Sequence, residues 1–172
     1  MDMKSGRARC AVAVFLGVAV ALVPLRAAAQ QHPTAKEYVE IFGGTIVAPG
    51  KFEIDGRSIA CEARSTVLDT HLNDATGAYR QFIMVNPDRL MKLPTTLRLW
   101  AFGVACGFAL LGNNQASADC YAIKRGRKEG WLTDEEVDRI CAFVRPSLRG
   151  PFNEVPGPQR CQRIRNCYRD NK

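Results

Sequence analysis

The chain has only two histidines, His32 and His71, so the side chains that most often transfer protons or bind transition metals are scarce. His71 lies in a polar stretch, LDTHLNDATG, which is typical of a solvent-exposed loop. Its alternative role is in a metal-dependent catalytic site, formed together with Gln115, Asp119 or the acidic residues of the same loop. Histidine-based chemistry therefore has few residues available to it.

His32 has a metal-binding hypothesis of its own. If the chain is cut after Ala29, the new N-terminus reads Gln30-Gln31-His32. A free amine followed by histidine at the third position supplies the nitrogen ligands of a square-planar Cu(II) or Ni(II) site. Cyclisation of the terminal glutamine, or cleavage one residue away, would remove this site.

Cysteine offers a different chemistry. Cys10 lies in the segment that we expect to be removed, and an even number of cysteines in an exported chain predicts a disulfide framework. Zinc binding by thiolates is the alternative, but no two cysteines are spaced as CxxC. Sequence does not fix the pairing, although helix placement suggests a bridge between Cys106 and Cys120. The six cysteines after the first are Cys61, Cys106, Cys120, Cys141, Cys161 and Cys167.

Residues 1–29 have the pattern of a secretory signal peptide. Lys4, Arg7 and Arg9 precede an apolar run, AVAVFLGVAVALVPL, and small residues up to Ala29 supply a cleavage site. The run is shorter than the roughly 20 residues of a membrane span. An uncleaved anchor is the alternative. We therefore predict a periplasmic or secreted protein in which residues 30–172 form one domain.

The charge of the chain is mildly basic, with 24 Lys and Arg against 17 Asp and Glu. Seven of the basic residues lie from Arg145 onward, opposed there only by Glu154 and Asp170. Such a segment can contact an anionic surface, whereas predicted export argues against a nucleic-acid partner.

The spacing of apolar residues changes along the rest of the chain, from a period of two, typical of strands, to about 3.6 from Leu93 onward, typical of helices. Residues 45–70 are rich in β-branched residues, and Asp55-Gly56 suits a two-residue hairpin turn. We predict a short helix before this segment, two or three antiparallel strands in it, a loop at NDATG, and a further strand, YRQFIMVNP, that ends at Pro87. The later segments predict helices at 94–112, 115–127, 133–145 and 159–170, the third beginning with a capping box at Thr133. Strands followed by helices predict an α+β fold, with a small antiparallel sheet and a helical half.

The first long helix contains an apolar run, residues 99–111, in which Gly103 and Gly107 form a GxxxG pattern. The run is too short for a bilayer span and predicts a buried core helix. Each glycine costs about 1 kcal/mol of helix propensity relative to alanine. Close helix packing is one explanation for the glycines, and loss of former functional side chains is the other.

Residues 79–132, with FIMVNP, a Leu-Pro helix entry and ADCYA followed by GRKEGW, resemble the core of small exported zinc metallopeptidases of the gluzincin type. In that family a helix bearing HExxH is followed by a helix bearing ExxxD. The resemblance aligns Gly103 and Gly107 with the zinc-binding histidines, Val104 with the catalytic glutamate, and Gln115 with the third ligand. Only Asp119 matches, at the position of a carboxylate that orients a ligand.

The resemblance therefore implies a metallopeptidase-like scaffold with no catalytic residues, no metal site and no cofactor, in which Asp119 becomes a capping residue or an arginine partner. We expect a module that binds a peptide or protein, with the strand at 82–86 serving as an edge beside the helix at 93–112. The alternatives are a divergent metal-dependent peptidase with a displaced site, and a structural protein of the cell envelope.

Overall fold

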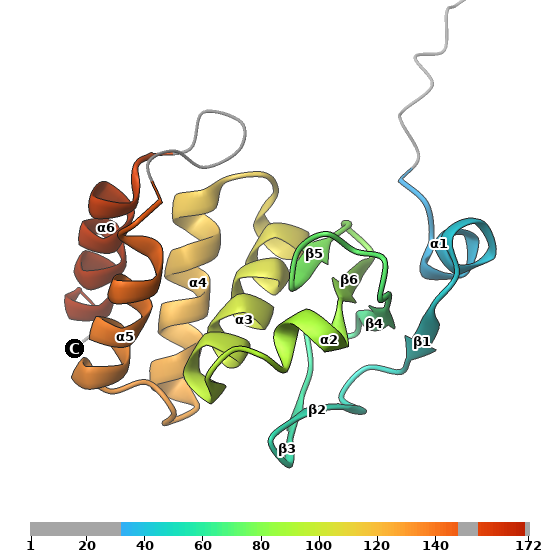
Figure 1. The fold of residues 1–172 in the computed structure, drawn as a ribbon, viewed down its shortest axis with the longest axis horizontal. Helices are drawn as coiled ribbons and strands as arrows, with labels where there is room; N and C mark the ends of the chain where they lie inside the picture. The colour runs from blue at the N-terminus through green and yellow to red at the C-terminus, as the bar shows by residue number, and fades with distance from the viewer. Residues whose placement is uncertain (1–31, 148–154, 171–172) are drawn as a thin grey trace, which may run out of the picture. The chain divides into compact units, whose positions relative to one another are not determined.

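The computed structural model describes residues 32–147 and 155–170, and within them strands precede a set of longer helices (Figure 1). The predicted α+β class is therefore confirmed. In chain order the described elements are α1 (Ala35–Phe42), β1 (Thr45–Val47), β2 (Phe52–Ile54), β3 (Arg57–Ile59), β4 (Ser65–Leu68), β5 (Thr76–Ala78), β6 (Phe82–Val85), α2 (Pro87–Leu90), α3 (Thr95–Leu111), α4 (Gln115–Lys128), α5 (Asp134–Val144) and α6 (Gly157–Arg169).

The sheet has four strands in the order β1-β4-β6-β5, and β2 and β3 form a separate hairpin. The hairpin prediction is confirmed, since Asp55 and Gly56 both have positive φ, 52° and 74°. The other strands are less regular than predicted: β6 pairs antiparallel with β5 but parallel with β4. A parallel pair needs a connection of about a dozen residues or more, and here that connection contains β5.

Strand β5 begins at Thr76 and takes the last two residues of the NDATG segment, for which a loop was predicted. The prediction is wrong for those two residues, whereas Asn73, Asp74 and Ala75 lie outside any strand, as predicted. The strand forms because β6 supplies a pairing partner, with Thr76 opposite Val85 and Gly77 opposite Met84. The glycine also leaves room for the Met84 side chain, whose flexible end would have to shift to admit a Cβ at position 77, since Cε lies 2.8 Å from that point. Strand pairing therefore overrides a local sequence that is typical of a turn.

The helix predictions are confirmed to within a few residues, because the local caps form. Thr34 caps α1 in a reciprocal capping box with Glu37. Thr133 caps α5 by accepting the backbone N–H of Glu136 at 3.4 Å. The carboxylate of Glu136 instead accepts a hydrogen bond from the hydroxyl of Thr96 on α3, so this cap also joins two helices.

Helix α3 is the central element of the described structure, and its apolar run packs on two sides. One set of its side chains, including Leu99 and Phe102, packs with Ile83 and Val85 of β6. Another, including Trp100, belongs to a cluster with side chains of α4, α5 and α6. In Figure 1, α4 lies beside α3, and α5 and α6 lie beyond α4. The predicted core helix is thus confirmed. Among the described helices, none has the length and apolar character needed to cross a bilayer.

Three disulfides are present in the described residues, and they are Cys61–Cys106, Cys120–Cys167 and Cys141–Cys161. The bridge that we expected between Cys106 and Cys120 is wrong. Although both cysteines lie on the packed pair α3 and α4, Cys106 packs in the cluster that contains Cys61 and β6, whereas Cys120 bonds to α6. In the chain-entropy model each bond stabilises the fold by about 3–4 kcal/mol for loops of this length.

Candidate functional site

The two glycines aligned with zinc-binding histidines lie where α3 packs against α4. A Cβ at Gly107 would lie 2.7 Å from Cα and 2.9 Å from the carbonyl oxygen of Ala118. A Cβ at Gly103 would lie 2.9 Å from Cβ of Ala122. Val104 is buried in the helical core. Close helix packing therefore accounts for both glycines, and their positions face a helix contact.

The other two residues of that alignment lie on α4. Gln115 is its first residue, and its side-chain nitrogen is buried with no hydrogen-bond partner among the described residues. Asp119 is only 2% exposed and accepts two hydrogen bonds, both of 2.8 Å, from the guanidinium of Arg160 on α6. The same guanidinium lies 5.0 Å from the ring centroid of Trp100. Asp119 thus fixes α6 against α3 and α4.

The two histidines lie outside the helical half. His71 follows β4, and its side chain is 85% exposed, with Nδ1 at 3.4 Å from the carboxylate of Asp69. His32 is exposed, with its ring 6.2 Å from that of Tyr79, while Gln30 and Gln31 lie outside the described residues. Within residues 32–147 and 155–170, no three side chains of His, Cys, Asp or Glu gather closely enough to hold a metal ion.

Asp69 is buried and attaches α1 to the sheet. Its carboxylate accepts hydrogen bonds from the Tyr38 hydroxyl at 2.6 Å and from the backbone N–H of His71 at 2.8 Å. The Tyr38 hydroxyl, and to a lesser extent His71, hold the pKa of Asp69 below its ordinary value. Burial, followed by the interaction with Asp69, raises the pKa of Tyr38. These groups form a structural anchor beneath α1.

We expect Tyr38→Phe to lower the free energy of unfolding at pH 7 by about 1–3 kcal/mol, because a buried carboxylate loses a hydrogen-bond donor. Since the pKa of Asp69 is depressed on folding, its contribution is present above the unfolded value, about 3.9, and is lost as the pH falls through the folded value. Urea unfolding from pH 7 to pH 2 should therefore show a smaller acid-induced loss in Tyr38→Phe than in the native protein. Tyr79→Phe is the control, and an equal effect in both variants would contradict the assignment.

Strand β6 cannot serve as the peptide-binding edge that the sequence suggested. It lies between β4 and β5, and all four of its residues are buried. The outer strands of the sheet are β5 and β1. The residues of β5 are half-buried, and its Thr76 hydroxyl donates to the carbonyl oxygen of Ala101 on α3. In β1, by contrast, Thr45 and Ile46 are exposed, so β1 is the more exposed of the two outer strands, and we refer to it as the open edge of the described sheet.

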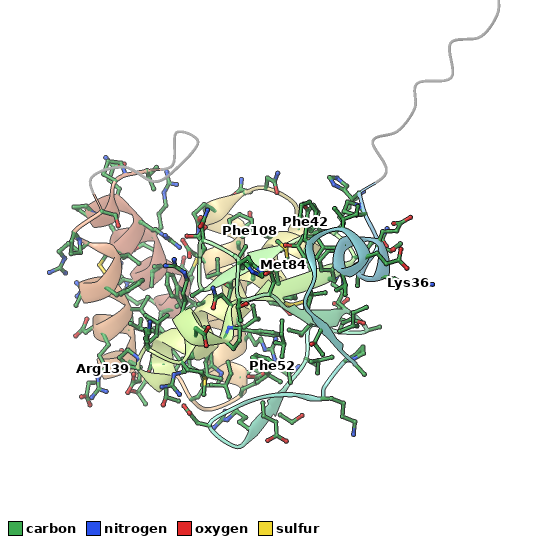
Figure 2. All side chains as sticks on the ribbon, turned by 45° about the vertical axis from the view of Figure 1, so that its right-hand side comes forward. Lys36, Phe42, Phe52, Met84, Phe108 and Arg139 are labelled. Carbon is green, nitrogen blue, oxygen red and sulfur yellow. A yellow bond between two sulfur atoms is a disulfide. The ribbon has the colours of Figure 1, made fainter. Side chains whose placement is uncertain are left out.

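Large apolar side chains are exposed beside this open edge. Ile41 and Phe42, at the end of α1, are 70% and 56% exposed, and Ile46 of β1 is 42% exposed. We refer to these three residues as the α1–β1 surface; Figure 2 labels Phe42 within it. The chain from Ile41 to Gly50, IFGGTIVAPG, carries no charged residue. The sequence predicts that Ile41 and Phe42 lie in a helix, but it does not show that the sheet leaves their side chains exposed.

Some of the basic side chains of the C-terminal segment are paired with acidic side chains of the same chain. Arg160 pairs with the buried Asp119, and Arg165 pairs with Asp138 of α5 at 2.7 Å. The groove between α5 and α6 is lined by acidic as well as basic side chains, among them Asp134 and Arg169. This face therefore presents both signs of charge, and the α1–β1 surface is the stronger candidate for binding.

No protein family model, curated protein or solved structure matches this chain.

Proposed function

We propose that this protein is an exported, catalytically inactive module with a metallopeptidase-like scaffold, and that it binds a protein partner through the α1–β1 surface. The observation that carries the proposal is the exposure of Ile41, Phe42 and Ile46 beside an uncharged sheet edge. The signal-like sequence of residues 1–29 and the three disulfides support export, because such bonds persist in oxidising compartments.

Edge strands in soluble proteins are usually protected, because their unpaired backbone groups can pair with another chain. Charged residues, prolines and bulges are the usual protection. Here the three residues of β1 are Thr45, Ile46 and Val47, which are good strand formers and carry no charge. Exposed apolar side chains on the helix beside such an edge are typical of an interaction surface.

The size of the surface also supports binding. Large apolar side chains expose on the order of 200 Å² each when fully free, so the exposed fractions of Ile41, Phe42 and Ile46 amount to roughly 300 Å². This is in the range of the largest apolar patch on an ordinary soluble protein, and such patches are often functional.

Photo-cross-linking in the exporting cell tests the proposal. A benzophenone side chain introduced at position 46 should give a discrete adduct with another protein. The same group at position 143 is the control, because Phe143 is also exposed, at 49%, but belongs to α5 of the helical half, where its ring lies 6.2 Å from that of Trp100. No adduct from position 46, or the same adducts from both positions, would overturn the proposal.

A further inference from the structure

We infer that the partner bound at the α1–β1 surface is an extended, uncharged peptide segment that adds a strand to β1, with apolar side chains at alternate positions. This inference rests on the proposed binding function and specifies the chemistry of its ligand. It follows from three features of the surface: the side of the sheet to which Ile46 points, the area exposed, and the absence of charge.

The register of β1 determines which side chains a new strand would meet. Ile46 is paired with Val67 of β4, and side chains paired across strands point to the same face of a sheet. Val67 packs with Tyr38 of α1, so Ile46 lies on the face that α1 covers. The ring of Phe42 is 4.9 Å from that of Tyr38, which places Phe42 at the margin of the same cluster.

A strand added beside β1 would project every second side chain toward this face. Those side chains would lie next to Ile46, on the face of the sheet where Tyr38 and Phe42 pack together. The side chains between them would project to the opposite face, as Thr45 and Val47 do. The ligand should therefore be apolar at alternate positions, while the intervening positions tolerate polar residues.

The area of the surface favours a peptide over a second copy of the chain. A stable protein dimer buries about 800 Å² from each partner, more than twice the roughly 300 Å² exposed by Ile41, Phe42 and Ile46. A segment of three or four residues pairing with Thr45–Val47 covers a surface of this size. Strand addition of this kind gains affinity from main-chain hydrogen bonds and specificity from alternate side chains.

The absence of charge on this edge indicates that the central residues of the peptide should also be uncharged. Ten consecutive residues, Ile41 to Gly50, are uncharged, with Glu40 before them and Lys51 after them. An ionised side chain on the central residues of the peptide would lose hydration and find no partner of opposite charge. Binding to this edge should therefore respond little to salt, unlike binding through the basic α6 segment.

The test is an NMR titration of the oxidised, ¹⁵N-labelled protein purified from exporting cells. The probe is a blocked heptapeptide, acetyl-Thr-Val-Thr-Ile-Thr-Val-Thr-amide, and the control peptide has the same side chains with alternate backbone nitrogens methylated. We expect saturable shifts at residues 41, 42 and 45–47. We expect at least tenfold weaker binding of the methylated peptide, which cannot complete the strand ladder, and less than a twofold change in affinity between 50 and 500 mM salt.

Two matched variants complete the test. Ile46→Lys places a charge on the edge and should weaken binding at least tenfold, whereas Phe143→Lys, at the exposed apolar position on α5, should leave it within twofold. Equal binding of both peptides, or equal effects of both variants, would overturn the inference. Concentration-dependent shifts of residues 45–47 without peptide would identify a second copy as the ligand and overturn it as well. A cross-link from position 46 with no response to the peptide would leave the proposed function standing and remove only the extended-strand ligand.

Discussion

Gly107→Ala should lower the free energy of unfolding by about 2 kcal/mol, even though alanine is the better helix former. The added Cβ would lie 2.7 Å from Cα and 2.9 Å from the carbonyl oxygen of Ala118. Because both are backbone atoms, no rotamer change relieves the contact, and α3 must move away from α4. Overpacking typically costs about 1–3 kcal/mol, and a contact with backbone atoms belongs at the upper end of that range. Subtracting the roughly 1 kcal/mol that alanine contributes through helix propensity leaves a net loss of about 2 kcal/mol.

Urea denaturation of the oxidised protein measures this effect. Leu111→Ala is the matched control on the same helix, because Leu111 is 56% exposed, and its expected change is within about 0.5 kcal/mol. If Gly107→Ala stabilised the protein, the close approach of α3 and α4 would be contradicted. The hypothesis that the glycine replaced a functional side chain would then be the remaining explanation.

Asp119→Ala should lower the free energy of unfolding by about 3–5 kcal/mol, since it leaves the largely buried guanidinium of Arg160 without its carboxylate. The side chains of Asp119 and Arg160 are 3% and 20% exposed. Asp138→Ala is the control. It breaks a pair of similar length with Arg165 on the same helix α6, but those side chains are 67% and 46% exposed, so the expected loss is below about 1 kcal/mol.

A double variant separates burial from pairing at this site. Asp119→Leu combined with Arg160→Met removes both charges and keeps apolar volume against Trp100. It should recover most of the stability lost in Asp119→Ala, because paired removal of a buried ion pair is often nearly neutral. Similar losses in the Asp119 and Asp138 single variants would show that Asp119 does not anchor α6.

The helices could be predicted closely because their boundary signals act over a few residues. Thr34, Thr133 and the glycine at position 112 lie within one turn of the helix that each begins or ends. The hairpin at Asp55-Gly56 was predictable for the same reason. Local chemistry therefore accounts for the α+β class and for most element boundaries.

The order of strands in the sheet was not predictable, because it depends on pairs that are distant in the chain. Nothing near residues 82–85 shows that β4 and β5 will lie on either side of them, so β6 reads equally well as an edge or a centre. The prediction of a Cys106–Cys120 bond was wrong for the same reason, because the turn of α3 that bears Cys106 faces Cys61, 45 residues away. The candidate surface was missed because exposure of Ile41 and Phe42 depends on how far the sheet extends beneath α1.

The placement of the three disulfides sets an order of events during biosynthesis. Cys61 and Cys106 both precede α4 in the chain, so the bond between them can form as soon as α3 has been synthesised. The other two bonds both end on α6, the last helix of the chain. Until α6 arrives, Cys120 and Cys141 are thiols with no native partner, and a mistaken bond between them would block both native bonds. Oxidative folding of the helical half therefore depends on the last helix to emerge, and we expect the yield of native protein to depend on disulfide isomerisation.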